Sequence, residues 1–160
     1  MIVRPIETKD IETMVWMGAA LAQESPVYRT MKYGAEKTQS FLEDAADPGV
    51  EHIAAWVVEY EEKIIGFMVG YTSEHPYFLD IISWDGTLYI SPNYRGKARA
   101  AIRVMVEYYV EWAKKWDGPI KIGITTGIAT DGVEKLLNRC GFKTTGKILD
   151  YVWAEETEET

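Results

Sequence analysis

The sequence predicts an α/β protein of the α+β type, in which a mixed, mostly antiparallel sheet carries helices on both faces. Two observations lead to this prediction. Apolar residues recur every three to four positions in some stretches, which is the spacing of a helix, whereas other stretches are rich in β-branched and aromatic residues, which favour strands. These stretches follow one another as strand, two helices, three strands, helix, strand, helix and strand. The chain has 160 residues, 47% of them hydrophobic, so we expect a single domain over 1–154 around one core.

The N-terminal part of the chain is predicted to form one strand and two helices. Residues 2–6 are typical of a short strand. Apolar residues at helical spacing predict a helix over 8–24, which ends at Ser25 because a residue before proline avoids helical backbone angles. A second helix is predicted over 35–46. The segment between the two helices is predicted to be irregular.

The middle of the chain is predicted to form three strands. Residues 52–60 and 63–71 are rich in β-branched and aromatic side chains, and Glu61-Glu62 between them predicts a hairpin. A third long strand is predicted over 79–90.

The third strand contains Asp85-Gly86, a pair that favours a bulge. After this strand, apolar positions at helical spacing predict a long helix over 97–116. We expect the sheet to separate this long helix from the two helices over 8–24 and 35–46.

The C-terminal part of the chain is predicted to form a strand over 120–126, a short helix over 132–140 and a last strand over 147–154. Gly141 suits the left-handed position that commonly ends a helix. The acidic residues 155–160 are predicted to be a frayed tail.

Composition argues against several classes of function. The net charge of −8 argues against a nucleic-acid backbone as the main partner, and no run of about 18 apolar residues predicts a membrane span. The N-terminal residues contain no long apolar run, so we expect no signal peptide. The single cysteine, Cys140, excludes an internal disulfide and fits a reducing cytoplasm. With only two histidines, His52 and His75, no metal site is expected.

The junction between the third strand and the long helix suggests phosphate binding. The strand ends at Ile90, and a turn of small residues with three cations, Arg95, Lys97 and Arg99, leads into the helix. The first amide protons of a helix have no partner inside the helix, and the helix dipole favours negative charge there. The alternative is an ordinary helix start with solvated cations, and this junction by itself does not decide between the two.

Two stretches resemble one known family. The first is Ile90-x-Pro92-x-Tyr94-Arg95-Gly96-Lys97-Ala98-x-Ala100, and the second is Val133-x-x-Leu136-Leu137-Asn138-Arg139-Cys140-Gly141-Phe142. With the order of elements, they make the chain resemble the GNAT N-acetyltransferase superfamily from Ile2 to about Ala154. The family pattern is Arg or Gln, two residues, Gly, one residue, then Gly or Ala. This chain departs from it at Ala98, where the family has Gly.

The resemblance implies a six- to seven-stranded sheet and acetyl-coenzyme A as the co-substrate, with no metal. The backbone amides of 96–101 would hold the pyrophosphate of the cofactor, and the main chain of 88–90 would pair with its pantetheine arm. In the family, the strand that corresponds to 79–90 diverges from the next strand, here 120–126, and the thioester enters between them. The residues expected to bind the cofactor are Leu88, Tyr89, Ile90, Arg95, Gly96, Lys97, Ala98, Arg99, Ala100 and Ala101.

The catalytic groups are less clear from the sequence. Many members of the family protonate the leaving thiolate with a tyrosine of the last helix, and the matching position here is Leu137. A frequent family asparagine aligns with Thr130. Asp85 and, behind it, Glu74 are the candidate general bases, because relatives often carry a carboxylate base on or near the third long strand. The alternative for Asp85 is a purely structural place in the bulge.

The acceptor site is expected near Tyr28, Tyr33 and Trp84. In the family the segment between the first two helices commonly walls this site, although the two tyrosines are nearly as well explained as aromatic caps on the core. The acceptor itself is expected to be a primary amine of a small molecule or of a protein. Members of the family often dimerise, so a homodimer is compatible with the resemblance.

Two functions remain open at this point. The first is an acetyl-CoA-dependent N-acetyltransferase of the cytoplasm. The second is a GNAT-fold binding or interaction protein that is catalytically weak or inactive. The absence of the usual tyrosine at Leu137 leaves room for the second, whereas the intact strand, turn and helix around Arg95 and Gly96 favour the enzyme.

Overall fold

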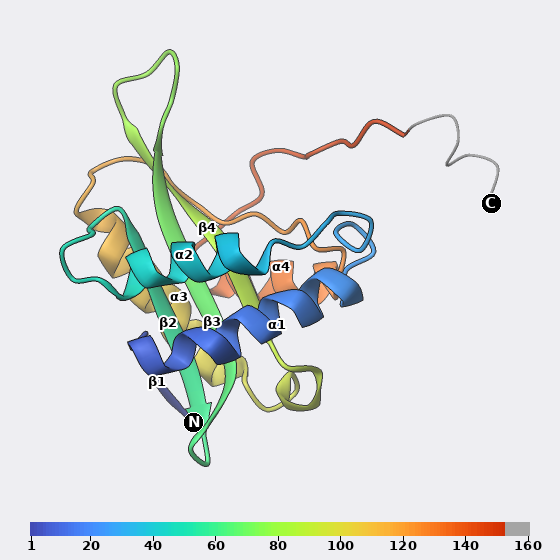
Figure 1. Cartoon of the computed structure of the whole chain (residues 1–160). Coiled ribbons are helices and arrows are strands. Elements are labelled where there is room, and N and C mark those ends of the chain that lie inside the picture. The colour runs from blue at the N-terminus through green and yellow to red at the C-terminus, as the bar shows by residue number, and fades with distance from the viewer. Residues whose placement is uncertain (153–160) are drawn as a thin grey trace.

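The computed structural model describes residues 1–152 and contains a five-stranded sheet with helices on both faces (Figure 1). The elements are β1 (Ile2–Pro5), a 3-10 turn η1 (Thr8–Asp10), α1 (Ile11–Glu24), α2 (Ala35–Ala46), β2 (Ile53–Tyr60), β3 (Lys63–Glu74), β4 (Ile81–Ile90), a 3-10 turn η2 (Pro92–Tyr94), α3 (Arg99–Lys114), β5 (Ile120–Lys121) and α4 (Thr130–Arg139). The strands lie in the order β1-β2-β3-β4-β5. Neighbours are antiparallel except β4 and β5, which are parallel, so the sheet is mixed and mostly antiparallel as predicted.

The sheet separates two halves of the core. On one face, α1 and α2 contribute Met14 and Leu42, which pack with Val57 of β2. On the other face, α3 contributes Met105 and Tyr109, which are completely buried. Alternation along the strands produces this division, since successive side chains of a strand point to opposite faces. The predicted placement of the first two helices opposite the long helix is therefore confirmed.

The hairpin between β2 and β3 turns at Glu61-Glu62, as predicted. Both glutamates have positive φ, 49° and 63°, which suits the tight turns that match the twist of two antiparallel strands. The helix predicted over 35–46 is α2 with the same bounds.

Two of the predicted strands differ from the structure. The fifth strand spans only Ile120–Lys121 rather than 120–126. Residues 147–152 of the predicted last strand form no strand, and residues 153 and 154 lie outside the described residues, as does the predicted tail over 155–160. The described sheet therefore has five strands, not six or seven. In Figure 1 the segment after α4 runs away from the body, and residues 147–152 form no ladder with another strand.

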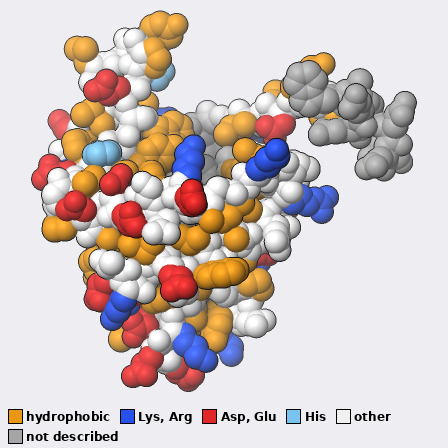
Figure 2. Space-filling view, in the orientation of Figure 1, with side chains coloured by type: hydrophobic (Ala, Val, Ile, Leu, Met, Phe, Trp, Pro, Cys, Tyr) orange, Lys and Arg blue, Asp and Glu red, His pale blue; other side chains and the backbone are white. Residues whose placement is uncertain are grey.

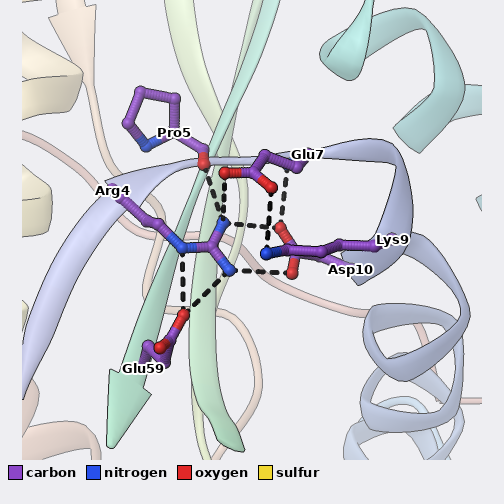
Figure 3. Close-up of polar contacts among 6 residues, drawn as sticks. All are labelled: Arg4, Pro5, Glu7, Lys9, Asp10 and Glu59. Atoms are coloured by element: carbon purple, nitrogen blue, oxygen red, sulfur yellow. Dashed lines mark hydrogen bonds and ion pairs between the residues drawn. The ribbon is translucent and has the colours of Figure 1, made fainter. Parts of the chain in front are cut away.

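Arg4 joins the first strand to its surroundings (Figure 3). Its guanidinium donates to both carboxylate oxygens of Asp10 at 2.7 and 2.9 Å, and to Glu59 of β2 at 3.1 Å. Burial acts to raise the pKa of Asp10, but the hydrogen bonds from Arg4 and from the amide of Glu7 outweigh it and hold the pKa below its usual value. This ionic cluster fixes β1 and the start of α1 against β2.

Candidate active site

The site begins where β4 and β5 stop pairing. The two strands form ladder pairs only at Ser83–Ile120 and Trp84–Lys121. The next residue of β4, Asp85, reaches across with its side chain, and its Oδ1 accepts the amide proton of Gly123 at 2.7 Å. From there β4 continues to Ile90 paired with β3, while no β4–β5 ladder pair follows among the described residues. This divergence agrees with the splay that the family resemblance implies.

A bulge sets the direction of the Asp85 side chain. Val69 of β3 pairs with Thr87 and the adjacent Gly70 pairs with Asp85, which leaves Gly86 as an extra residue on β4. The bulge predicted at Asp85-Gly86 is therefore confirmed. A bulge and a functional carboxylate are not alternatives here, because bulges commonly re-aim a side chain next to a site.

Burial changes the acid–base character of Asp85. Its partial removal from water raises the pKa to about 6, although the hydrogen bond from the Gly123 amide acts in the opposite direction. A carboxylate with this pKa is mostly ionised at neutral pH and is still basic enough to take up a proton. This raised pKa is the feature that a general base working near neutral pH requires.

Tyr109 of α3 lies near enough to Asp85 for the charge of the carboxylate to act on its hydroxyl. Its ring is fully buried and its hydroxyl donates to the carbonyl of Lys121 at 2.7 Å. Burial, followed by the charge of Asp85, raises the pKa of Tyr109 above its usual value. Tyr109 therefore stays protonated at neutral pH and ties β5 to α3 on this face of the sheet.

The turn before α3 presents unpaired amide protons. The N–H groups of Gly96, Ala98, Arg99, Ala100 and Ala101 donate no hydrogen bond to any residue that the structure describes. The first turn of α3 also carries no acidic residue. Such an array at a helix N-terminus, where the dipole is positive, is suited to a phosphate or pyrophosphate group.

Ala98 and Gly96, two small residues of this turn, have different surroundings. At Ala98 the backbone φ is −95°, and the methyl group is fully buried in the core beneath α3. The departure from the family glycine at Ala98 therefore requires no left-handed backbone. At Gly96, by contrast, an added Cβ would meet no atom within 4 Å, so this residue borders open space.

The cations of the turn are not equivalent. Lys97 and Arg99 are exposed and form no ion pair with any described residue. Lys97, together with Ala100 and Ala101, borders a groove of about 530 Å³ between α3 and β1. Arg95 is instead held by the protein, since its Nε donates to the carbonyl of Ile90 at 2.9 Å and its Nη2 donates to Glu24 at 2.7 Å.

The residues predicted to border the acceptor lie at three different places. The hydroxyl of Tyr28 hydrogen-bonds to Thr125 Oγ1 at 2.5 Å, beside the extension of β5. The hydroxyl of Tyr33 donates to the carbonyl of Val15 at 2.7 Å, so this ring packs on α1. Trp84 adjoins Asp85 on β4 and thus points to the opposite face.

Glu74, the second candidate base, lies away from Asp85. It pairs with Ile81 near the end of the β3–β4 ladder, whereas Asp85 pairs with Gly70, four residues along β3. At about 3.3 Å per residue, this separation is about 13 Å along the strand. The hairpin beyond Glu74 projects from the body, and hydrophobic atoms cover its tip (Figure 2). The structure therefore does not bring the two candidate bases together.

A family assignment follows from comparison with known proteins. The sequence matches the model of the Acetyltransferase (GNAT) family over residues 19–142. The chain belongs to the GNAT acetyltransferase family. No curated protein sequence matches it significantly.

Solved structures of the same fold are distant in sequence. A predicted acetyltransferase from Clostridium acetobutylicum, solved with acetyl-CoA, has a TM-score of 0.69 and 15% identity, and the match covers 96% of this chain and 97% of that one. Glucosamine-6-phosphate N-acetyltransferase from Arabidopsis thaliana has a TM-score of 0.68 and 13% identity, with 95% and 97% covered. Ribosomal-protein-alanine N-acetyltransferase from Brucella melitensis biovar Abortus 2308 has a TM-score of 0.63 and 14% identity, with 96% and 99% covered. These likenesses establish the GNAT fold.

Leu137 occupies the position of the usual GNAT tyrosine, and its side chain is part of the core. Leu137 is 4% exposed and packs with the α3 face of the sheet. Gly141, with φ of 95°, ends α4, and the amide of Phe142 returns to the carbonyl of Leu137 at 3.1 Å. Thr130 is the first residue of α4. None of these residues supplies a tyrosine hydroxyl.

Two residues with a bearing on the site were missed by the sequence analysis. Gly123 supplies the amide that holds Asp85, and Glu24 supplies the carboxylate that holds Arg95. The spacing of apolar residues within a helix or strand does not reveal such pairs, because their partners are 38 and 71 positions away in the chain.

Neither a metal cluster nor a membrane span is found in residues 1–152. No three His, Cys, Asp or Glu side chains in this range gather as metal ligands would. No helix in the same range has the length and apolar character that crossing a membrane requires.

Proposed function

We propose that this protein is an acetyl-CoA-dependent N-acetyltransferase that acetylates a primary amine, either of a small molecule or of a protein lysine or N-terminus. The observation that carries the proposal is the array of five unpaired amides at the start of α3, which follows the stretch of β4 that no longer pairs with β5. An anion-binding turn and an unpaired strand edge in one place fit the two ends of coenzyme A.

The donor would be held mainly by the main chain. The amides of Gly96 and of residues 98–101 suit the pyrophosphate, and the exposed Lys97 and Arg99 add positive charge around it. The edge of β4 over 88–90 has no ladder partner on the β5 side, and its Ile90 carbonyl accepts a hydrogen bond from Arg95. This edge can accept the pantetheine arm at Leu88 and Tyr89 as a strand accepts an added neighbour. Acetyl-CoA, when bound, supplies an acetyl thioester that an unprotonated amine can attack.

Asp85 would prepare the amine. An ammonium ion has no lone pair for attack, so a base must first remove a proton. The carboxylate of Asp85 has one oxygen held by the Gly123 amide, and its raised pKa of about 6 suits proton uptake near neutrality. Asp85 would take the proton directly or through a water molecule, and its negative charge would also attract a cationic acceptor.

The tyrosine that protonates the leaving thiolate in many GNAT members is replaced here by Leu137, which is buried. Protonation would fall to water or to another residue. General acid catalysis is typically worth about 10²–10⁴-fold, so its absence predicts a slow enzyme rather than an inactive one.

A second candidate function rests on the same observation. With Leu137 in the core, the protein would bind acetyl-CoA and serve as a binding or interaction protein with little or no turnover. The two functions share the donor site and differ only in turnover.

A binding experiment followed by a turnover experiment separates these functions. Acetyl-CoA should raise the melting temperature, since a ligand that binds only the native state stabilises it. The protein is then incubated with acetyl-CoA and a panel of primary amines, and free thiol is measured. Amine-dependent thiol release supports the enzyme, whereas stabilisation without thiol release across the panel supports the binding protein. No stabilisation at millimolar acetyl-CoA would contradict both.

A further inference from the structure

One short segment of the chain contacts both of the diverging strands. Residues 24–28 begin with the last residue of α1 and contact the turn after β4 and the extension of β5. On the β4 side, Glu24 binds both terminal nitrogens of Arg95, and the Nε of Arg95 donates to the carbonyl of Ile90 at 2.9 Å. This chain of contacts ties α1 to the last residue of β4.

The β5 side of the segment is anchored by Ser25. Its hydroxyl is completely buried, donates to the carbonyl of Thr126 at 2.6 Å and accepts the amide protons of Val27 and Tyr28. Every hydrogen bond of this hydroxyl is therefore made inside the protein. Replacing it would leave buried polar groups unpaired, which is costly.

Two further contacts support this anchor. Tyr28 hydrogen-bonds to Thr125, the residue before Thr126. Pro26 lies so close to Gly127 that an added Cβ at Gly127 would approach its ring to 2.9 Å, and Gly127 has a positive φ of 70°. The segment thus follows the chain of β5 over three successive residues beyond the point where β5 leaves β4.

The position of Glu24 is unfavourable for the helix itself. It is the last residue of α1, where the dipole is negative and where the last turn contains no basic residue. The bond from Arg95 lowers the pKa of Glu24 below its usual value, so the side chain is a carboxylate that the helix alone would not favour. An acidic residue at the C-terminal end of a helix goes against the preference of the helix dipole, which points to a role for Glu24 outside the helix.

We propose that residues 24–28, the strap hereafter, set the distance between the ends of β4 and β5, and that Glu24, Ser25 and Arg95 are positioning residues of the donor site. The proposal rests on the proposed function for the identity of the ligand. Each nitrogen of the Arg95 guanidinium already donates to Ile90 or Glu24. The two N–H groups that remain, one on each terminal nitrogen, belong to a cation whose charge is already paired with the Glu24 carboxylate. Arg95 therefore acts on the width of the site through Glu24, and the phosphate is bound by the amides and the exposed cations.

The strap can be tested in the ligand-free protein. Glu24→Gln and Arg95→Gln should each accelerate amide hydrogen exchange in residues 90–95 and 125–128, because the two strand ends lose their link. Glu12→Gln is the matched control, since Glu12 is an exposed carboxylate in the first turn of the same helix. Exchange in Glu24→Gln equal to that of Glu12→Gln would overturn the strap, whatever the protein binds.

Two ligands separate a positioning role from a phosphate contact. Binding of acetyl-CoA and of S-acetylpantetheine, which lacks phosphate, is measured by NMR titration. We expect each of the two variants to weaken both ligands by a similar factor, about 5- to 30-fold, and the double variant to be no weaker than either. If Arg95→Gln weakens acetyl-CoA alone while Glu24→Gln weakens neither, Arg95 binds phosphate directly and the positioning role is overturned.

The kinetic constants of Glu24→Gln and ligand binding by the wild-type protein provide two further tests. In the enzyme, Glu24→Gln should raise KM for acetyl-CoA more than it lowers kcat, whereas a partly unfolded variant would lose kcat first. Wild-type protein that binds neither ligand would contradict the proposed function and the donor-site role together. Hydrogen exchange would then still decide whether the strap sets the spacing of the strands.

Discussion

The carboxylate of Asp85 accepts the amide proton of Gly123 at 2.7 Å, at the position where β4 and β5 cease to pair. This contact links the two strands through a side chain instead of a backbone ladder. It also leaves the carboxylate partly removed from water, which raises the pKa of Asp85 to about 6. A structural tie and a raised carboxylate pKa are therefore combined in one residue.

Replacing Asp85 by asparagine tests its role as the base. Wild-type kcat/KM should rise with pH through about 6 and then level off, because Asp85 must be deprotonated to accept a proton. In Asp85→Asn the rate should fall by about 10²–10⁴-fold and its pH dependence should move to higher pH, where the free amine is more abundant. Acetyl-CoA affinity should change little. Asp80→Asn, at an exposed carboxylate just before β4, is the control. Rates within about twofold of wild type over roughly pH 6–9 would remove Asp85 from the mechanism.

The open space at Gly96 leads to a prediction about the donor site. Because an added Cβ there meets no protein atom within 4 Å, Gly96→Ala should fold with an unchanged melting temperature. It should nevertheless weaken acetyl-CoA binding if the pyrophosphate approaches this backbone closely. Gly96→Pro should abolish the thermal shift, since it also removes an amide donor. Gly146→Ala, at another position with open space, is the control. An undiminished shift in folded Gly96→Pro would place the pyrophosphate elsewhere.

The ionic cluster of Arg4 predicts a pH-dependent loss of stability. The folded pKa of Asp10 lies below its unfolded value of 3.8, so its contribution is full above that pH and is lost as the pH falls through the folded value. Asp10→Asn should lower the free energy of unfolding by about 1.5–3 kcal/mol at neutral pH, since hydrogen bonds to a charged group are lost. Urea unfolding at about pH 7 and about pH 3 measures this. A difference between the two proteins that is the same at both pH values would contradict the assignment.

Close packing at Gly118 predicts a large effect from one methyl group. A Cβ at Gly118 would lie 2.0 Å from the carbonyl oxygen of Ile81, which belongs to the backbone of β4 and cannot move aside like a side-chain end. Gly118→Ala should therefore destabilise the fold by about 1–3 kcal/mol or more, because β5 must shift away from β4. The melting temperature of the purified variant measures the effect. A variant as stable as Gly146→Ala would show that β5 does not enter the sheet here.

Local patterns determined much of this protein. Apolar positions at helical spacing specified α1 and α3, and Glu61-Glu62 and Asp85-Gly86 specified a hairpin turn and a bulge. These features depend on backbone angles and on which side of an element is buried, both of which follow from residues close together in the chain. The resemblance of the turn at 95–100 to the GNAT pattern added the family.

The tertiary structure decided what depends on a distant partner. A strand needs a neighbour for its backbone hydrogen bonds, so residues 122–126 and 147–152 have strand-like sequences without forming strands in the described chain. Asp85 gained a base-like pKa only when burial beside β5 removed water from it. Arg95 has the sequence of a phosphate ligand, yet its guanidinium is bound by Glu24, 71 positions away. Electrostatic interactions and strand pairing join residues that are far apart in the sequence. The spacing of residues within one helix or strand therefore does not predict which groups the fold brings together.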